Sequence, residues 1–106
     1  MMNRQRQIEK FLLAAHRLAL QRLRAQPACI EPVRAQLARW RVQSGPTASD
    51  AYWDEWQRLL AADIEEIERV VCADNEHGAV LRSVSPMSSL ITQLERLQLL
   101  REARAA

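Results

Sequence analysis

The sequence DAYWDEWQRLL, residues 50–60 of this 106-residue chain, carries its strongest structural signal. At about 100° per residue, the apolar side chains of this stretch fall within one arc about 120° wide. They are Tyr52, Trp53, Trp56, Leu59 and Leu60. The pattern predicts an amphipathic helix that begins at a cap, either the motif Thr47-x-x-Asp50 or the competing Ser49.

Two helices are expected on the N-terminal side of this stretch. From about Asn3 to about Ala25, apolar residues recur at steps of three and four; they are Ile8, Phe11, Leu12, Ala15, Ala19 and Leu23. A second helix is expected from about Glu31 to about Val42, because a proline is tolerated in a first helical turn. Its start could instead be Pro27. The Ser-Gly-Pro motif at residues 44–46 ends it.

Three further helices are expected on the C-terminal side. The motifs Asp63-x-x-Glu66 and Thr92-x-x-Glu95 resemble capping boxes, and Asp74 is expected to cap a short helix between them. The main apolar face of the last helix is expected to comprise Leu90, Leu94, Leu97 and Leu100. Leu99 points roughly the other way, which indicates either burial on two sides or contact with a partner.

These elements together predict an all-α protein. Five to six short helices joined by a few residues each are typical of a compact bundle or an orthogonal array. No internal repeat or long linker interrupts the chain, so residues 1–106 are expected to form a single helical domain.

Composition narrows the class of protein and its expected location. The apolar share of 48% and the charged share of 26% are ordinary for a globular protein. No apolar run approaches the ~20 residues of a membrane span, and no secretory signal is visible. Cys29 and Cys72 show no disulfide-scaffold pattern, so reduced thiols are the simpler expectation. We therefore expect a cytoplasmic protein that does not contact a membrane.

Charge is distributed unevenly along the chain. Residues 1–46 carry nine basic and two acidic side chains, whereas residues 47–80 carry two basic and nine acidic ones. The two halves could neutralise each other across the folded helices. Alternatively, they could form a two-pole surface that attracts nucleic acid or an acidic protein at one pole and a basic protein at the other.

The residue types that carry chemistry are few and widely spaced. A zinc site built from His16, Cys29, Cys72 and His77 would lack the close ligand spacing that such sites use. There is no glycine-rich phosphate loop, and Cys72 with His77 is a weak nucleophile–base pair. No catalytic residue, metal, cofactor or small-molecule substrate is therefore expected, and the chain is not expected to be an enzyme.

Three strings carry a family resemblance. They are residues 52–60, YWDEWQRLL, residues 81–87, LRSVSPM, and residues 94–96, LER. This set resembles segments of small bacterial helical proteins that occur with, or fused to, helix-turn-helix regulators in toxin–antitoxin-like operons. Residues 16–19, HRLA, and the region of Trp40 are similar to the same proteins. The resemblance implies a regulatory or antitoxin-like role in protein binding, without catalytic residues.

Two functional hypotheses follow. The first is a non-enzymatic protein-interaction module, antitoxin-like or accessory to a transcriptional regulator, that docks on a protein partner or on a second copy of itself. The alternative is direct nucleic-acid binding through the basic N-terminal half. The contact residues expected for either are Arg4, Arg6, Arg34, Arg39 and Arg41.

Overall fold

A computed structural model describes residues 3–105, and these residues form helices and turns without strands. The all-α expectation is therefore confirmed. The α-helices are α1 (Arg4–Ala25), α2 (Ile30–Ser44), α3 (Asp50–Leu59), α4 (Ile64–Val71), α5 (Glu76–Ser83) and α6 (Gln93–Ala105). Two short 3₁₀ segments, η1 (Pro27–Cys29) and η2 (Met87–Leu90), were not predicted from the sequence.

Most helix starts follow the local capping chemistry. Asp63 accepts a hydrogen bond from the Glu66 amide at 2.9 Å. The predicted capping box at α6 is complete, since the Thr92 amide donates to Glu95 at 2.8 Å and the Glu95 amide donates to Thr92 at 3.1 Å. Each bond satisfies an amide that the first helical turn leaves without a partner. These starts were readable because both partners lie within three residues of each other.

One predicted cap was wrong by one residue. The cap of α5 is Asn75 rather than Asp74, because the Asn75 side chain accepts from the Gly78 amide at 2.7 Å. Helix α2 begins at Ile30, within one residue of the expected start near Glu31, and the 3₁₀ turn before it begins at the alternative start, Pro27. Adjacent residues with similar capping ability cannot be ranked by propensity alone, so the backbone path decides between them.

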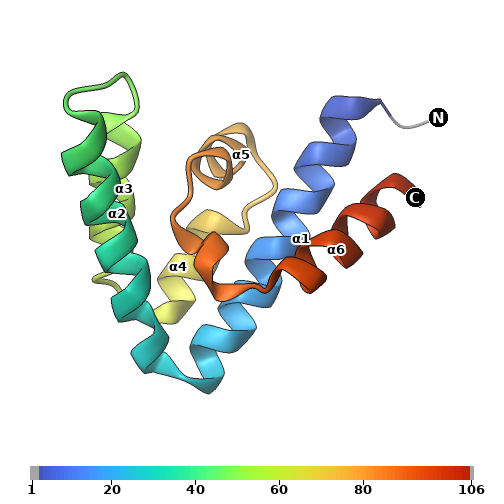
Figure 1. The fold of residues 1–106 in the computed structure, drawn as a ribbon, viewed down its shortest axis with the longest axis horizontal. Coiled ribbons are helices and arrows are strands. Elements are labelled where there is room, and N and C mark those ends of the chain that lie inside the picture. Colours follow the sequence, from blue (N-terminus) through green and yellow to red (C-terminus); the bar gives the residue numbers. More distant parts are fainter. Residues whose placement is uncertain (1–2, 106) are drawn as a thin grey trace.

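The helices are arranged around the long helix α1 (Figure 1). Helix α6 runs antiparallel to the first half of α1 and packs against it. Helices α2 and α3 form a hairpin on the other side of the molecule, and α4, α5 and η2 lie between the two arms. The Cα radius of gyration is 13.7 Å, close to the ~13 Å of a compact chain of about 100 residues. Among the described residues, no helix is long and apolar enough to span a bilayer.

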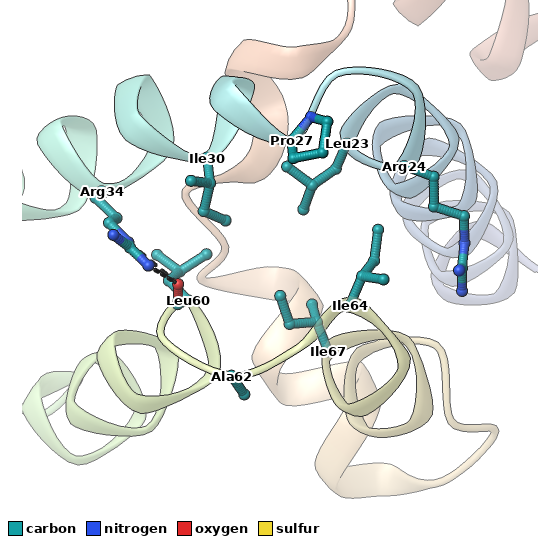
Figure 2. Close-up of a pocket in the computed structure, with 9 residues that line it drawn as sticks. All are labelled: Leu23, Arg24, Pro27, Ile30, Arg34, Leu60, Ala62, Ile64 and Ile67. Atoms are coloured by element: carbon teal, nitrogen blue, oxygen red, sulfur yellow. Dashed lines mark hydrogen bonds between the residues drawn. The ribbon is translucent and has the colours of Figure 1, made fainter.

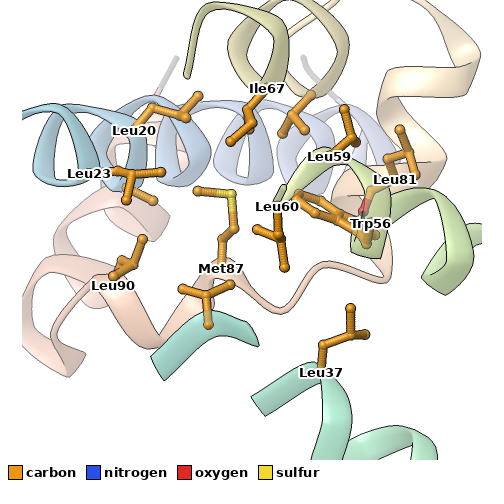
Figure 3. Close-up of a cluster of buried hydrophobic side chains, with 13 residues drawn as sticks. Leu20, Leu23, Leu37, Trp56, Leu59, Leu60, Ile67, Leu81, Met87 and Leu90 are labelled. Carbon is orange, nitrogen blue, oxygen red and sulfur yellow. Dashed lines mark hydrogen bonds between the residues drawn. The ribbon is translucent and has the colours of Figure 1, made fainter. Parts of the chain in front are cut away.

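The main core is built around Trp56, whose side chain is fully buried (Figure 3). Its indole Nε1 donates to the Leu81 carbonyl oxygen at 2.9 Å, which joins α3 to α5. Aliphatic side chains from α1, α2, α4 and η2 complete this cluster, among them Leu20, Leu37, Ile67 and Met87. A smaller cluster of Phe11, Ala15 and Ala103 lies between α1 and α6.

The expected apolar face of α6 was partly wrong. Leu94 and Leu97 are 80% and 43% exposed, whereas Ala103 is buried and Leu99 and Leu100 pack against the Phe11 cluster. Helix α6 has apolar residues on two sides, so periodicity alone could not show which side meets α1. The packing of α6 on α1 determines which side is buried, and it leaves the side with Leu94 and Leu97 facing outward.

Part of the charge is neutralised between distant segments. Arg22 forms an ion pair with Glu95, and the pKa of Glu95 falls to about 2 because of Arg22 and the hydrogen bond from Thr92. Arg24 contacts Glu65 at 3.1 Å and Glu68 at 3.2 Å, which links α1 to α4. Water reaches all of these pairs and screens them, so each adds little to stability.

His16 is a titratable residue buried in the core, with an exposed fraction of 5%. Its Nδ1 donates to the Leu12 carbonyl oxygen at 2.7 Å, since a carbonyl can only accept. Its Nε2 has no hydrogen-bond partner within residues 3–105. Burial is the main reason that the pKa of His16 falls from 6.5 to about 4; the Leu12 carbonyl opposes this shift and the Arg82 charge adds to it.

Acidification is therefore expected to destabilise the protein through His16. The unfolded chain binds a proton near pH 6.5 that the folded chain binds only near pH 4, so the stabilisation is complete above pH 6.5 and is lost as the pH falls towards 4. Between pH 7 and pH 5 the unfolding free energy should fall by about 2 kcal/mol. Urea unfolding at both pH values, for the natural chain and for His16→Gln, measures this difference.

The variant His77→Gln is the matched control, because His77 is exposed and its ring bonds Glu55 at 2.8 Å on the surface. It should retain the full pH slope, whereas His16→Gln should lose it. Equal slopes in all three proteins would show that His16 is not responsible.

Candidate functional site

An apolar hollow lies between the α1–α2 corner and the α3–α4 turn (Figure 2). We call it the aliphatic groove, and its volume is about 420 Å³. Aliphatic side chains and one proline form its floor and walls: Leu23, Pro27, Ile30, Leu60, Ala62, Ile64 and Ile67. Arg24 and Arg34 stand at opposite edges of the groove (Figure 2).

Local sequence features bring these elements together. Pro27 and the 3₁₀ turn that follows redirect the chain from α1 into α2, which places Ile30 at the corner. The residue before a proline is pushed away from helical dihedrals, so the break is set locally. Helix α1 packs on α4 and helix α2 packs on α3, and the groove lies between the two pairs.

Arg34 ties one edge of the groove to the end of α3. Its Nε and Nη2 donate to the Leu60 carbonyl oxygen at 3.1 and 2.5 Å, and its Nη1 donates to Glu31 at 3.0 Å. The last carbonyls of a helix lack intrahelical donors, so this guanidinium takes over that role for α3. The hydrogen-bonding capacity of Arg34 is thus largely used within the chain.

A second hollow of about 450 Å³ adjoins the groove and shares Arg34 and Leu60 with it. Leu37 and Ala38 of α2 form one wall, and Gln57 and Ala61 lie opposite. At its edge, Arg41 donates to Asp54 at 2.6 Å and to Gln57 at 3.1 Å. The two hollows together extend the apolar surface along α2 for the two turns between Arg34 and Arg41.

The structure separates the basic residues that the sequence grouped together. Arg34 and Arg41 line the adjoining hollows. Arg39 is exposed and bonds Gln36 at 2.5 Å, away from these linings. Arg4 and Arg6 begin α1, and Arg4 lines a separate hollow beside α6. Arg24 and Ile64 were not among the contact residues expected from the sequence, because only the tertiary contact of α1 with α4 brings them together at the groove.

The groove carries no group suited to covalent or acid–base chemistry. Its lining contains aliphatic side chains and arginines, without a thiol, imidazole or carboxylate. Both cysteines are free thiols outside the lining, and burial raises the pKa of Cys72, which makes it a poorer nucleophile. Within residues 3–105, no group of three or more His, Cys, Asp and Glu side chains is arranged to hold a metal ion.

The groove can therefore act as a receptor for apolar groups, with fixed guanidinium groups at its edges. Aliphatic surface in a concave site favours ligands that bury apolar area, and the arginines at its edges are already paired with Glu31, Glu65 and Glu68. Comparison with known proteins finds no family model, no curated protein and no solved structure that matches this chain.

Proposed function

We propose that this chain is a non-enzymatic protein-interaction module, antitoxin-like or accessory to a transcriptional regulator. It receives an amphipathic helix of a partner protein in the aliphatic groove. The observation that carries the proposal is a concave aliphatic surface whose arginines are already bonded within the chain. Such a surface gains free energy by burying apolar side chains and offers no reactive group.

A helix suits this groove better than an extended strand. The groove is bounded by helices, whose backbone groups bond mainly within each helix, so the groove offers no sheet edge to pair with a strand. A helix places apolar side chains at every third or fourth position on one face. This spacing matches the apolar surface that the aliphatic groove and the adjoining hollow together form over two turns of α2. Each leucine-sized side chain that enters fully adds about 1.5–3 kcal/mol.

Site-specific photocrosslinking in cells that naturally produce the chain tests this proposal. A photoreactive residue at Ala62, which is exposed and lines the groove, should give one discrete adduct. The same residue at Ala51, exposed on α3 outside the groove, is the matched control and should not give this adduct. The variant Ile64→Arg, which places a long charged side chain in the groove, should abolish the Ala62 adduct while the circular dichroism spectrum stays helical.

Adducts that are identical at positions 62 and 51, or none at either position, would contradict the proposal. The mass of a genuine adduct also reports whether the partner is another protein or a second copy of this chain.

Nucleic-acid binding is a second candidate because of one specific observation. Arg6, Lys10 and Arg17 fall within about 40° of one another around α1 at 100° per residue, and all three are exposed. None has an acidic hydrogen-bond partner within residues 3–105. A phosphate backbone could contact this stripe, unlike Arg34 and Arg41, which are engaged within the fold.

Salt titration with a fluorescent DNA duplex tests the second candidate. Three phosphate contacts predict a loss of affinity of about 40-fold between 50 and 200 mM salt, because each contact releases counterions. Lys10→Ala should reduce the salt slope by about one, whereas Arg58→Ala, exposed on the acidic helix α3, should leave it unchanged. Absence of binding at low salt removes this candidate.

A further inference from the structure

We propose that the helix received by the aliphatic groove is α6 of a second copy of this chain. This inference rests on the proposed function, since it names the partner of the same groove. Leu94 and Leu97 face outward from α6, with 80% and 43% of their surface exposed. An exposed pair of leucines at i and i+3 is the minimal apolar face of a docking helix.

Charge complementarity selects a second copy as the occupant. Helix α6 carries three arginines and two glutamates, whereas residues 50–83, which span α3 to α5, carry nine acidic and three basic residues. The arginines of α6 in one copy therefore find opposite charge on the acidic segment of another.

The two surfaces also match in spacing. Ile64 and Ile67 of α4 line the groove and are three residues apart. Leu94 and Leu97 on α6 have the same three-residue spacing. Beside the groove, Glu65 and Glu68 are 71% and 50% exposed at their side chains, although both contact Arg24. A helix that lays its leucines in the groove continues across α4 towards these carboxylates.

Arg101 and Arg104 lie on the part of α6 that would cross α4 near Glu65 and Glu68, where positive charge is favourable. Arg101 follows Leu94 by seven residues, so it lies on the same side of α6 about 10 Å further along. This distance is about the width of one helix. When α6 lies in the groove, Arg101 and Arg104 therefore lie across α4, on the side of Glu65 and Glu68. Both arginines are exposed and have no acidic hydrogen-bond partner within residues 3–105.

Each copy contributes both halves of the contact. A pair in which each α6 enters the groove of the other copy is closed by a twofold axis, so it forms two identical contacts and leaves neither surface unpaired. We therefore expect a dimer.

Sedimentation equilibrium of the purified chain tests the dimer, at concentrations up to about 100 µM. Leu94→Asp should raise the dimer dissociation constant by about 30-fold or more, because it buries an unpaired carboxylate in an aliphatic site. Val42→Asp is the matched control, since Val42 is equally apolar and 85% exposed but lies on α2 outside both hollows. It should leave the dissociation constant unchanged.

A charge exchange tests the orientation. The double variant Arg101→Glu/Arg104→Glu and the double variant Glu65→Lys/Glu68→Lys should each be monomeric, because like charges then meet in both contacts. Mixed in equal amounts, they should form a heterodimer, because opposite charges face each other again in both contacts.

A natural chain that stays monomeric at about 100 µM overturns the inference. Equal effects of Leu94→Asp and Val42→Asp on the dimer dissociation constant also overturn it. The same holds if the two charge-exchange variants form no heterodimer when they are mixed. These outcomes are distinct from failure of the proposed function: a monomeric chain whose Ala62 crosslinks to a different protein retains a working groove but loses its second copy as the occupant.

Discussion

Replacing Trp56 by alanine is expected to lower the free energy of unfolding by about 3–5 kcal/mol, because the substitution removes a large side chain from a closely packed core. Trp56 has no exposed surface and contacts the aliphatic cluster contributed by the surrounding helices (Figure 3). A domain of this size has only about 5–15 kcal/mol of stability in total. The variant should therefore unfold at a much lower urea concentration, as followed by circular dichroism.

The variant Trp56→Phe separates packing from hydrogen bonding. Phenylalanine retains much of the apolar volume but removes the Nε1 donor, which leaves the Leu81 carbonyl oxygen without its 2.9 Å partner. Trp56→Phe is expected to lower the free energy of unfolding by less than Trp56→Ala does. About 1–3 kcal/mol of that loss comes from the unpaired carbonyl. A loss of less than about 1 kcal/mol in Trp56→Ala would show that Trp56 is not central to the core.

Replacing Arg82 by methionine is expected to be the second large effect, with a loss of about 2–4 kcal/mol. Arg82 is buried without an acidic partner among residues 3–105, and its Nη1 donates to the carbonyl oxygens of Val71 and Ala73 at 2.7 and 2.9 Å. Methionine fills a similar volume but leaves both carbonyls at the end of α4 without a donor. Unfolding in urea measures the loss.

Arg58→Met is the control for Arg82, since Arg58 is exposed on α3 and should change the stability by no more than about 0.5 kcal/mol. Equal effects of the two substitutions would contradict the role of Arg82 in joining α5 to the end of α4. The local packing leaves no room for adjustment: a Cβ at Gly78 would lie 2.6 Å from the Ala73 oxygen and 3.0 Å from Arg82 Nη1.

The roles of the arginines could be predicted from the sequence only in part. Fourteen of the basic residues are chemically identical side chains, and five of them, Arg4, Arg6, Arg34, Arg39 and Arg41, were expected from the sequence as contact residues. In the fold, Arg82 closes a helix end, Arg34 does the same for α3 across the groove, and Arg6 and Arg17 remain on an exposed stripe. Each role depends on a carbonyl nine or more residues away in the sequence, or on the absence of such a partner, and composition encodes neither.

The sequence by itself determined the helices, the caps of α4 and α6 and the burial of Trp56, because these depend on periodicity and on partners within four residues. Only the tertiary structure decided which side of α6 meets α1, which arginines stay free, and that an aliphatic groove lies between α1–α2 and α3–α4. Helices with apolar residues on more than one side can pack in several ways of similar local energy. The choice among these packings is made by contacts between residues far apart in the chain, so the groove appears only when the whole fold is assembled.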